Sequence, residues 1–240
     1  SACGCARSQV VRDWEVSHDR PSIFGVEGRS AIRAAWQAAF AAESAAAAQD
    51  DFAQALLDLV KASESIPHDE LRRIARLKHY PLQVLRLALA ADRLPRVMEV
   101  DGAATRLASA SRGITAGSGM ATSELRLLLA ETMFSLKNAW PIFLKLYVDD
   151  LTIAASGKGV DIAANVASAT EDAVRAFREL GLEVSVKKSV AVANRPRVLA
   201  TVIQRCQAGA LTAADSAKLL GTSFAGGSRR SVQALRDRIA

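Results

Sequence analysis

The segment Leu146–Ile153 constrains the fold of this 240-residue chain more than any other. It places Asp149 and Asp150 between two apolar halves. Because consecutive strand residues point to opposite faces of a sheet, both carboxylates can serve one site only at a tight turn that interrupts the pleat. Two close carboxylates repel each other and are tolerated either in water at an exposed turn or beside a cation. The segment predicts two strands, Phe143–Val148 and Leu151–Ala154, whose connecting tip is either an ordinary polar turn or a cation site.

Half of the residues are hydrophobic, which is enough to bury a substantial core. The most apolar stretch, Pro81–Ala91, is interrupted by Gln83 and Arg86, so it is too short to cross a membrane. Ser1–Arg12 lacks the charged start and apolar core of a secretory signal. The three cysteines have neither the number nor the spacing of a disulfide framework or a zinc site. We therefore expect a globular intracellular protein, nuclear or cytoplasmic, with no membrane partner.

Hydrophobic periodicity and turn residues divide much of the chain into recognisable elements. We expect a strand over Phe52–Val60, then a helix over Pro67–Leu77 and, after a break at Tyr80 and Pro81, a second helix to about Asp92. A hairpin over Val97–Leu107 follows, with Asp101-Gly102 at its turn, and then a helix over Ala121–Lys137. After the two strands described above, we expect a helix over Asp161–Leu180 and an extended pair over Glu183–Val192. Without the insertions, the order from Asp58 is strand, helix, strand, strand, helix, strand. This is the split βαβ arrangement of ferredoxin-like antiparallel sheets, an α+β fold.

One further helix is expected near the N-terminus, with Ser30 as its cap. Ile32, Trp36 and Phe40 recur four residues apart and form an apolar stripe over an alanine-rich body. We expect this stripe to pack into the core rather than to form a site.

The formal net charge of +6 comes entirely from the C-terminal part of the chain. Residues 1–150 contain 18 basic and 18 acidic side chains, whereas residues 151–240 contain 13 and 7. Such a surplus either solubilises a helix surface or attracts a phosphate backbone in a salt-dependent way. In the second case we expect the contacts to come from Arg195, Arg197, Arg205, Arg229 and Arg230.

Several short boxes resemble those of reverse transcriptases of the non-LTR retroelement branch, and they occur in the same order. Tyr147-Val148-Asp149-Asp150 resembles the central motif of that family, and Asp58 matches the metal-binding acid of its first palm motif. The other matching segments are the glycine-bearing loop Arg112–Ser118, the lysine motif Leu180–Lys188 and the Leu-Gly turn of Lys218–Gly221.

The resemblance implies a polymerase palm with helical partial fingers, and an RNA-directed DNA polymerase of a mobile genetic element. It implies partial fingers in residues 1–50, a palm in residues 51–194, and a basic palm end or start of a thumb in residues 195–240. The implied partners are an RNA or DNA template-primer and deoxynucleoside triphosphates. The implied cofactors are two Mg²⁺ ions, with Mn²⁺ as an alternative, because hard carboxylate oxygens suit such cations.

The resemblance also implies roles for single residues. Asp58 and Asp149 would be the main metal ligands, with Asp150 in support. Lys187 or Lys188 would neutralise or protonate the departing pyrophosphate, and strand alternation indicates that only one of the two faces the site. The residues implied to contact nucleotide or template are Ser63, Gly113, Ala116, Gly117 and Tyr147.

Three departures from the family pattern leave a second hypothesis open. Ser63 stands where the family has an aromatic ring that excludes a ribose hydroxyl, and Ala116 stands where a glutamine is common. The segment after the lysine motif is too short for a full thumb. The chain is therefore either a polymerase or a catalytically degenerate relative that only binds nucleic acid.

Two other classes are less favoured. A nucleotide cyclase would share paired acids on a ferredoxin-like core, but the ordered boxes and the basic C-terminal part do not indicate one. His18, His68 and His79 lie in polar contexts without a nucleophile box, so we expect surface or capping roles for them rather than a hydrolase site.

Overall fold

The computed structural model describes residues 2–97, 99–115, 118–158, 161–207 and 211–227, with side chains from residue 9 onward. The chain divides into two compact units that interleave along the sequence. Unit 1 consists of Ser1–Asp19, Lys61–Glu131 and Leu180–Leu182, and unit 2 of Arg20–Val60, Thr132–Glu179 and Glu183–Ala240. The expected boundaries after residues 50 and 194 separate fingers, palm and C-terminal part, and this assignment stays a prediction.

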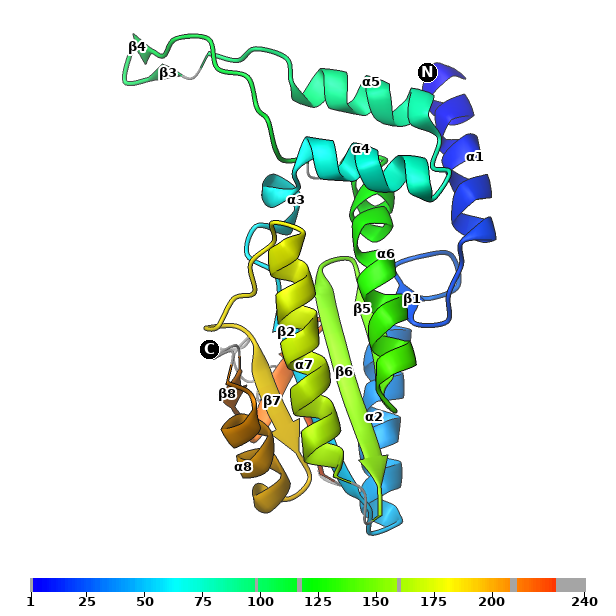
Figure 1. Cartoon of the computed structure of the whole chain (residues 1–240), viewed down its shortest axis with the longest axis vertical. Coiled ribbons are helices and arrows are strands. Elements are labelled where there is room, and N and C mark those ends of the chain that lie inside the picture. The colour runs from blue at the N-terminus through cyan, green and yellow to red at the C-terminus, as the bar shows by residue number, and fades with distance from the viewer. Residues whose placement is uncertain (1, 98, 116–117, 159–160, 208–210, 228–240) are drawn as a thin grey trace. The chain divides into compact units, whose positions relative to one another are not determined.

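Unit 2 is built on a six-stranded sheet with the order β1-β5-β6-β2-β7-β8 (Figure 1). Its four central strands pair antiparallel in the order that a split βαβ fold requires, so the predicted core topology is confirmed. The edge strands pair parallel to their neighbours and were not predicted from the sequence. The bounds are β1 Ile23–Phe24, β2 Asp51–Asp58, β5 Phe143–Tyr147, β6 Asp150–Gly157, β7 Val190–Ala193 and β8 Thr212–Ala213.

Helices cover this sheet on both faces. One face carries α7 (Ile162–Glu179) and α8 (Pro196–Arg205), and the other carries α2 (Ala31–Ala47) with the hairpin of β9 (Ser216–Leu219) and β10 (Thr222–Ala225). Side chains of β2 alternate between the two layers, as the strand period of two requires. Phe52 and Leu56 join the core formed with α2 and the hairpin, whereas Leu57 points to the opposite face.

The prediction for the apolar stripe of α2 is wrong. Ser30 caps the helix as expected, accepting a hydrogen bond from the Arg33 amide. Ile32, Trp36 and Phe40, however, are 78%, 61% and 57% exposed. The alanines on the opposite side of the helix are buried instead, because a small side chain lets the helix backbone approach the sheet closely. These residues are Ala34, Ala35, Ala38, Ala42 and Ala45. The sequence pattern marked the correct helix and the wrong face.

Unit 1 is mainly helical. Its elements are α1 (Ala2–Ser17), α3 (Ala62–Ser65), α4 (His68–Leu77), α5 (Leu82–Asp92), the hairpin of β3 (Glu99–Val100) and β4 (Ala103–Ala104), and the beginning of α6 (Ala121–Ala139), which continues into unit 2. The predicted hairpin turn is confirmed, since Asp101 and Gly102 both have positive φ, at 52° and 79°.

Helix α1 was not predicted, because the first residues show no apolar period. Trp14 nevertheless anchors it: the side chain is 6% exposed, and the indole N–H donates to the Lys78 carbonyl at 2.8 Å. No helix in the described part of the chain is long and apolar enough to span a membrane.

Candidate active site

Strand register brings the predicted acids to one end of the unit 2 sheet. Asp58 is the last residue of β2 and lies opposite Asp150, the first residue of β6. Tyr147, the last residue of β5, also pairs with Asp150, so Val148 and Asp149 form the two-residue turn between β5 and β6. The predicted hairpin tip is therefore confirmed, with Asp149 in the turn and Asp150 on the strand.

The turn holds Val148 in an unusual conformation. Its φ of 57° lies in the left-handed region, which a β-branched side chain rarely adopts. Such backbone strain is maintained only where the surrounding structure enforces it, and it is common at functional sites. The Val148 side chain borders Gly25, where an added Cβ would lie 3.5 Å from Cγ2 of Val148.

The backbone of Asp58 is fixed on both sides by residues distant in sequence. Its N–H donates to Oγ of Ser189 at 3.1 Å, and its carbonyl accepts from the Ser185 N–H at 2.8 Å. Ser189 is completely buried. Neither serine was identified from the sequence, since nothing local marks them as neighbours of Asp58.

The three carboxylates interact electrostatically. The pKa of Asp150 is raised to about 6, mainly by burial and in addition by the charges of Asp149 and Asp58, while the charge of Lys188 opposes the shift. The pKa of Asp149 is raised by burial and by Asp58, against hydrogen bonding to its own backbone amide and the charge of Lys188. This site concentrates negative charge in a partly desolvated place, an arrangement that an added cation would relieve.

Lys188 is the lysine that reaches the acids. Its Nζ lies 3.4 Å from Oδ1 of Asp58, although the lysine side chain is 70% exposed. A turn at residues 186–188 interrupts the extended pair expected over Glu183–Val192 before β7 begins at Val190, so the strand alternation expected for Lys187 and Lys188 is wrong. The turn, rather than strand alternation, distinguishes Lys188 from Lys187.

A small cavity of about 70 Å³ opens beside the acids. Its lining includes Asp58, Asp150 and Lys188, together with Lys218 and Leu220 from the β9–β10 hairpin. Leu220 and the next residue, Gly221, both have positive φ, which makes a tight turn at the expected Leu-Gly position. Lys218 is thus a second cation near the carboxylates that sequence reasoning did not assign to the site.

Lys145 is another positive group that the sequence did not single out. It lies on β5 with its Nζ 3.4 Å from the Ala34 carbonyl. Burial lowers its pKa to about 8. It lines a second small cavity with Tyr147 and Asp150.

The carboxylates fit a metal only in part. Oδ1 of Asp58 is buried and accepts no hydrogen bond within the described residues, and its charge partner is the exposed ammonium of Lys188 at 3.4 Å, whose place a metal ion could take. No group of three His, Cys, Asp or Glu side chains among the described residues is gathered closely enough to hold an ion. Mg²⁺ commonly takes only one or two protein carboxylates and completes its shell with water and substrate phosphates. The donor set suits such a substrate-completed site rather than a closed protein cage.

The glycine-bearing loop belongs to unit 1. Gly113 has φ 90°, and an added Cβ would lie 2.9 Å from the Glu64 carbonyl oxygen, so only glycine fits there. The neighbouring Ile114 N–H donates to the Ser63 carbonyl at 2.7 Å. Ala116 and Gly117 lie outside the described residues.

Two buried side chains hold this loop. Asp92 accepts from both the N–H and the hydroxyl of Thr115. Nε2 of His68 lies 2.6 Å from the Gly113 carbonyl, and Arg93 donates to the other ring nitrogen at 3.0 Å. Because Arg93 can only donate, the proton must sit on Nε2. His68 is fully buried, so the expectation of a surface role is wrong for this histidine.

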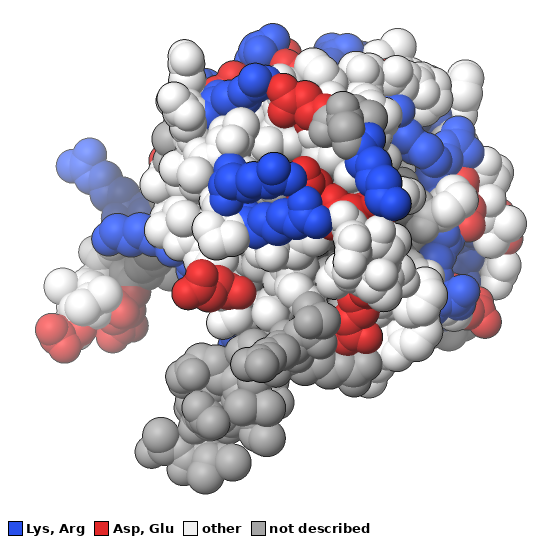
Figure 2. All heavy atoms as spheres, turned by 90° about the horizontal axis from the view of Figure 1, so that it is seen from below, with Lys and Arg blue, Asp and Glu red and all other residues white. Residues whose placement is uncertain are grey.

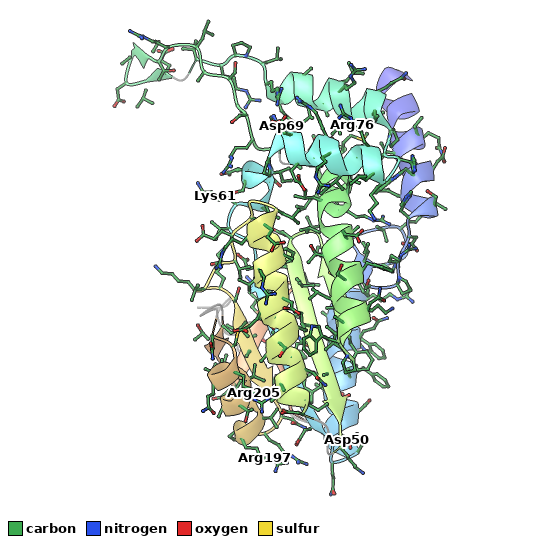
Figure 3. All side chains as sticks on the ribbon, viewed as in Figure 1. Asp50, Lys61, Asp69, Arg76, Arg197 and Arg205 are labelled. Carbon is green, nitrogen blue, oxygen red and sulfur yellow. The ribbon has the colours of Figure 1, made fainter. Side chains whose placement is uncertain are left out.

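The predicted arginines of the C-terminal part are engaged with carboxylates. Arg195 and Arg197 both pair with Asp51, at 2.7 and 3.2 Å, and Arg205 pairs with Asp161 at 2.8 Å. Arg197 and Arg205 lie on α8 (Figure 3). The face in Figure 2 likewise shows basic and acidic side chains interspersed. Arg229 and Arg230 lie outside the described residues.

A family model described as reverse transcriptase (RNA-dependent DNA polymerase) matches residues 8–224. The chain belongs to the reverse transcriptase family. The match covers both the acids and the glycine-bearing loop, so the resemblance drawn from the sequence boxes is confirmed at the level of the family. A comparison with curated protein sequences gave no match.

Solved structures support the reverse transcriptase fold. Apo telomerase from Candida tropicalis, truncated from its C-terminal domain, has a TM-score of 0.62 at 11% identity, covering 95% of this chain and 45% of that one. Telomerase from the same organism in complex with a TWJ fragment of telomeric RNA has a TM-score of 0.64 at 10% identity, covering 94% and 37%. The chain thus spans less than half the length of these structures.

Proposed function

We propose that this chain carries out template-directed nucleotidyl transfer as an RNA-directed DNA polymerase of a mobile element. The observation that carries the proposal is the pairing of Asp58 with Asp150 across β2 and β6, beside Asp149 in the turn. Family membership supplies the reaction class, and the acids supply a place for it. The substrates would be a template-primer and deoxynucleoside triphosphates.

Phosphoryl transfer depends mainly on positioning and charge stabilisation. Two Mg²⁺ ions, or Mn²⁺, would activate the attacking hydroxyl and stabilise the leaving oxygen. Asp58, whose buried Oδ1 makes no hydrogen bond among the described residues, and Asp149 are the main ligands that we propose, and Asp150 supports them from the strand. Ser189 and Ser185 keep Asp58 in place through its backbone.

The lysines have a separate task in this proposal. Lys188 offsets the charge of Asp58 and is exposed enough to turn toward a phosphate. We assign to Lys188, rather than Lys187, the neutralisation of the departing pyrophosphate. Tyr147 and the loop around Gly113 would contact nucleotide or template.

Primer extension on an RNA template with Mg²⁺ or Mn²⁺ tests the proposal. We expect incorporation by the wild type and none by Asp150→Asn. Asp161→Asn is the matched control, because Asp161 is a carboxylate that pairs with Arg205 and caps α7, and asparagine can still cap. If the wild type binds duplex but never extends it with either metal, the chain is the degenerate binding module instead.

A further inference from the structure

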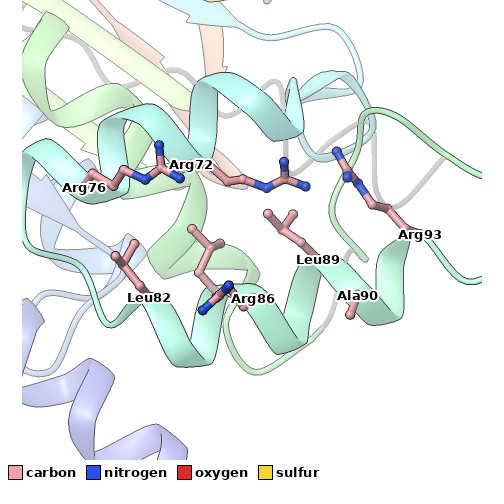
Figure 4. Close-up of a pocket in the computed structure, with 8 residues that line it drawn as sticks. Arg72, Arg76, Leu82, Arg86, Leu89, Ala90 and Arg93 are labelled. Carbon is pink, nitrogen blue, oxygen red and sulfur yellow. The ribbon is translucent and has the colours of Figure 1, made fainter.

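A groove of about 580 Å³ lies between α4 and α5, and arginines form its walls (Figure 4). Arg72 and Arg76 come from successive turns of α4, Arg86 comes from α5, and Arg93 is the residue directly after α5. All its lining residues belong to unit 1, and none of them is acidic. The remaining lining residues are Leu82, Leu85, Leu89 and Ala90.

The groove keeps much of its positive charge. Among the described residues, no carboxylate pairs with Arg76 or Arg86, and both side chains are exposed. Glu70 of α4 is engaged outside the groove, because it accepts two hydrogen bonds from Arg73, at 2.9 and 2.6 Å. Arg72 and Arg93 both pair with Asp69, at 3.0 and 3.6 Å, but Asp69 is 88% exposed, so water screens these pairs.

We propose that this groove binds the phosphodiester backbone of a nucleic-acid duplex. The guanidinium fork matches phosphate oxygens and can donate two hydrogen bonds to one phosphate. The identity of the ligand as nucleic acid rests on the proposed function, whereas the anionic character of the ligand rests on the groove itself.

The composition of the groove argues against other polyanions. An acidic amphipathic helix needs an apolar seam to bury, but Leu85 and Leu89 are already 1% and 2% exposed through packing within the unit. Only Leu82, at 40%, offers a large apolar surface. A single strand would be held by stacking of its bases on aromatic rings, and no aromatic residue lines the groove. Contacts to backbone phosphates remain the interaction that these residues can make.

The contacts of Arg93 decide which residues can be tested cleanly. Arg93 holds His68, which in turn contacts the Gly113 carbonyl, so replacing it would disturb the glycine-bearing loop. Arg76 and Arg86 have no such structural contact among the described residues. The double variant Arg76→Gln/Arg86→Gln therefore removes groove charge without removing a known fold contact.

The experiment measures the affinity of the full chain for a labelled RNA–DNA duplex by fluorescence anisotropy, in chelator, between about 50 and 200 mM salt. The control is Arg175→Gln/Arg178→Gln, which makes the same charge change on exposed positions of α7. We expect the groove variant to weaken binding about tenfold and to lower the slope of log affinity against log salt by about 2. The control should change the affinity less than about twofold. Charge reversal with Arg76→Glu/Arg86→Glu should weaken binding further, and circular dichroism verifies that each variant is folded.

Each outcome decides the matter. Equal losses in the groove and control variants would make the arginines an ordinary solvated surface and overturn the proposal. Unchanged duplex affinity together with lost binding of polyglutamate would assign the groove to an acidic protein and overturn it as well. Loss of duplex affinity in the groove variant alone supports the proposal even if primer extension fails, because the binding assay needs no chemistry. If the groove variant binds duplex and extends primers normally, the groove does not bind the duplex, and the polymerase proposal is unaffected.

Discussion

Like charges gather at two places in this chain, and the two places differ in how they hold them. At the ends of β2 and β6, strand register forces carboxylates together in a partly buried position, and the pKa of Asp150 rises to about 6. In the groove between α4 and α5, Arg76 and Arg86 project from helices into water. Solvent screens the arginines, whereas it reaches the acids only in part.

This difference teaches where specificity resides. Buried like charges cost folding free energy that a cation or a proton relieves, so they mark one place suited to one chemistry. Exposed arginines cost little and attract any polyanion of suitable shape, so they supply affinity rather than chemistry. The following predictions test this division.

The largest expected effect separates catalysis from binding. Asp150→Asn should reduce nucleotide incorporation by at least about a hundredfold, as removal of a group that stabilises transition-state charge does, and should leave duplex affinity unchanged. Arg76→Gln/Arg86→Gln should weaken binding but retain the incorporation rate at saturating duplex. Single-turnover primer extension and anisotropy on the same samples measure both. If either variant lowered both the incorporation rate and the duplex affinity, the separation of catalysis from binding would be wrong.

A second prediction perturbs unit 1 at the loop that Arg93 and His68 hold. Gly113→Ala should lower the free energy of unfolding by about 2–3 kcal/mol, because it combines a strained positive φ with a Cβ 2.9 Å from the Glu64 carbonyl. Gly102→Ala is the control, since Gly102 also has positive φ but open space around it, and about 1 kcal/mol is expected there. Equal losses in urea denaturation would show that the close approach to Glu64 relaxes without cost.

A third prediction concerns the cost of burying Asp150. In chelator, the folded group keeps its proton up to about pH 6, whereas the unfolded group loses it near its ordinary value of 3.8. Between these values the native state binds more protons, so the free energy of unfolding falls as pH rises. The loss is roughly 1–2 kcal/mol after allowance for solvent screening.

Asp150→Asn should therefore match the wild type near pH 4 and become more stable above pH 6, with chemical denaturation at several pH values as the measurement. Glu124 in unit 1, whose pKa burial raises to about 7, contributes the same slope to both proteins and cancels in the difference. Asp161→Asn should show no such divergence. A stability difference that does not vary with pH would contradict burial of the Asp150 carboxylate as its cause.

The smallest expected effect concerns sugar selection at Ser63. A small hydroxyl in place of an aromatic ring leaves room for a ribose hydroxyl, so the wild type should discriminate poorly between ribo- and deoxynucleotides. Ser63→Phe should raise the preference for deoxynucleotides by about tenfold. Single-nucleotide incorporation with both substrates measures this preference. A strong deoxynucleotide preference in the wild type would show that another residue guards the sugar.

Much of the fold could be predicted because its signals are local. The apolar run ending in Asp58, the Asp101-Gly102 turn and the Ser30 cap depend on residues within one or two turns of the chain, and the structure confirms all three. The acids of the candidate site were also identified from short segments, because the box Tyr147–Asp150 and the segment around Asp58 resemble motifs of the family in the same order. Their adjacency to Asp58 followed from the predicted strand order.

The supporting residues of the site could not be predicted in the same way. Ser189 and Lys218 approach Asp58 and Asp150 from segments far along the chain, and no local pattern marks their role. The sequence left both Lys187 and Lys188 as candidates for the lysine at the acids. The turn at residues 186–188 places Lys188 next to Asp58.

The sequence by itself determined several of the helices, the four central strands with their order in the sheet, and the position of the acids, because periodicity and turn chemistry are short-range. Only the tertiary structure decided which side of α2 is buried, which arginines are neutralised by Asp51 or Asp161, and that His68 lies inside unit 1. Burial and charge pairing depend on what a distant segment places opposite a residue. A stripe such as Ile32, Trp36 and Phe40 specifies a helix face, but the partner that covers a face is chosen by the fold as a whole.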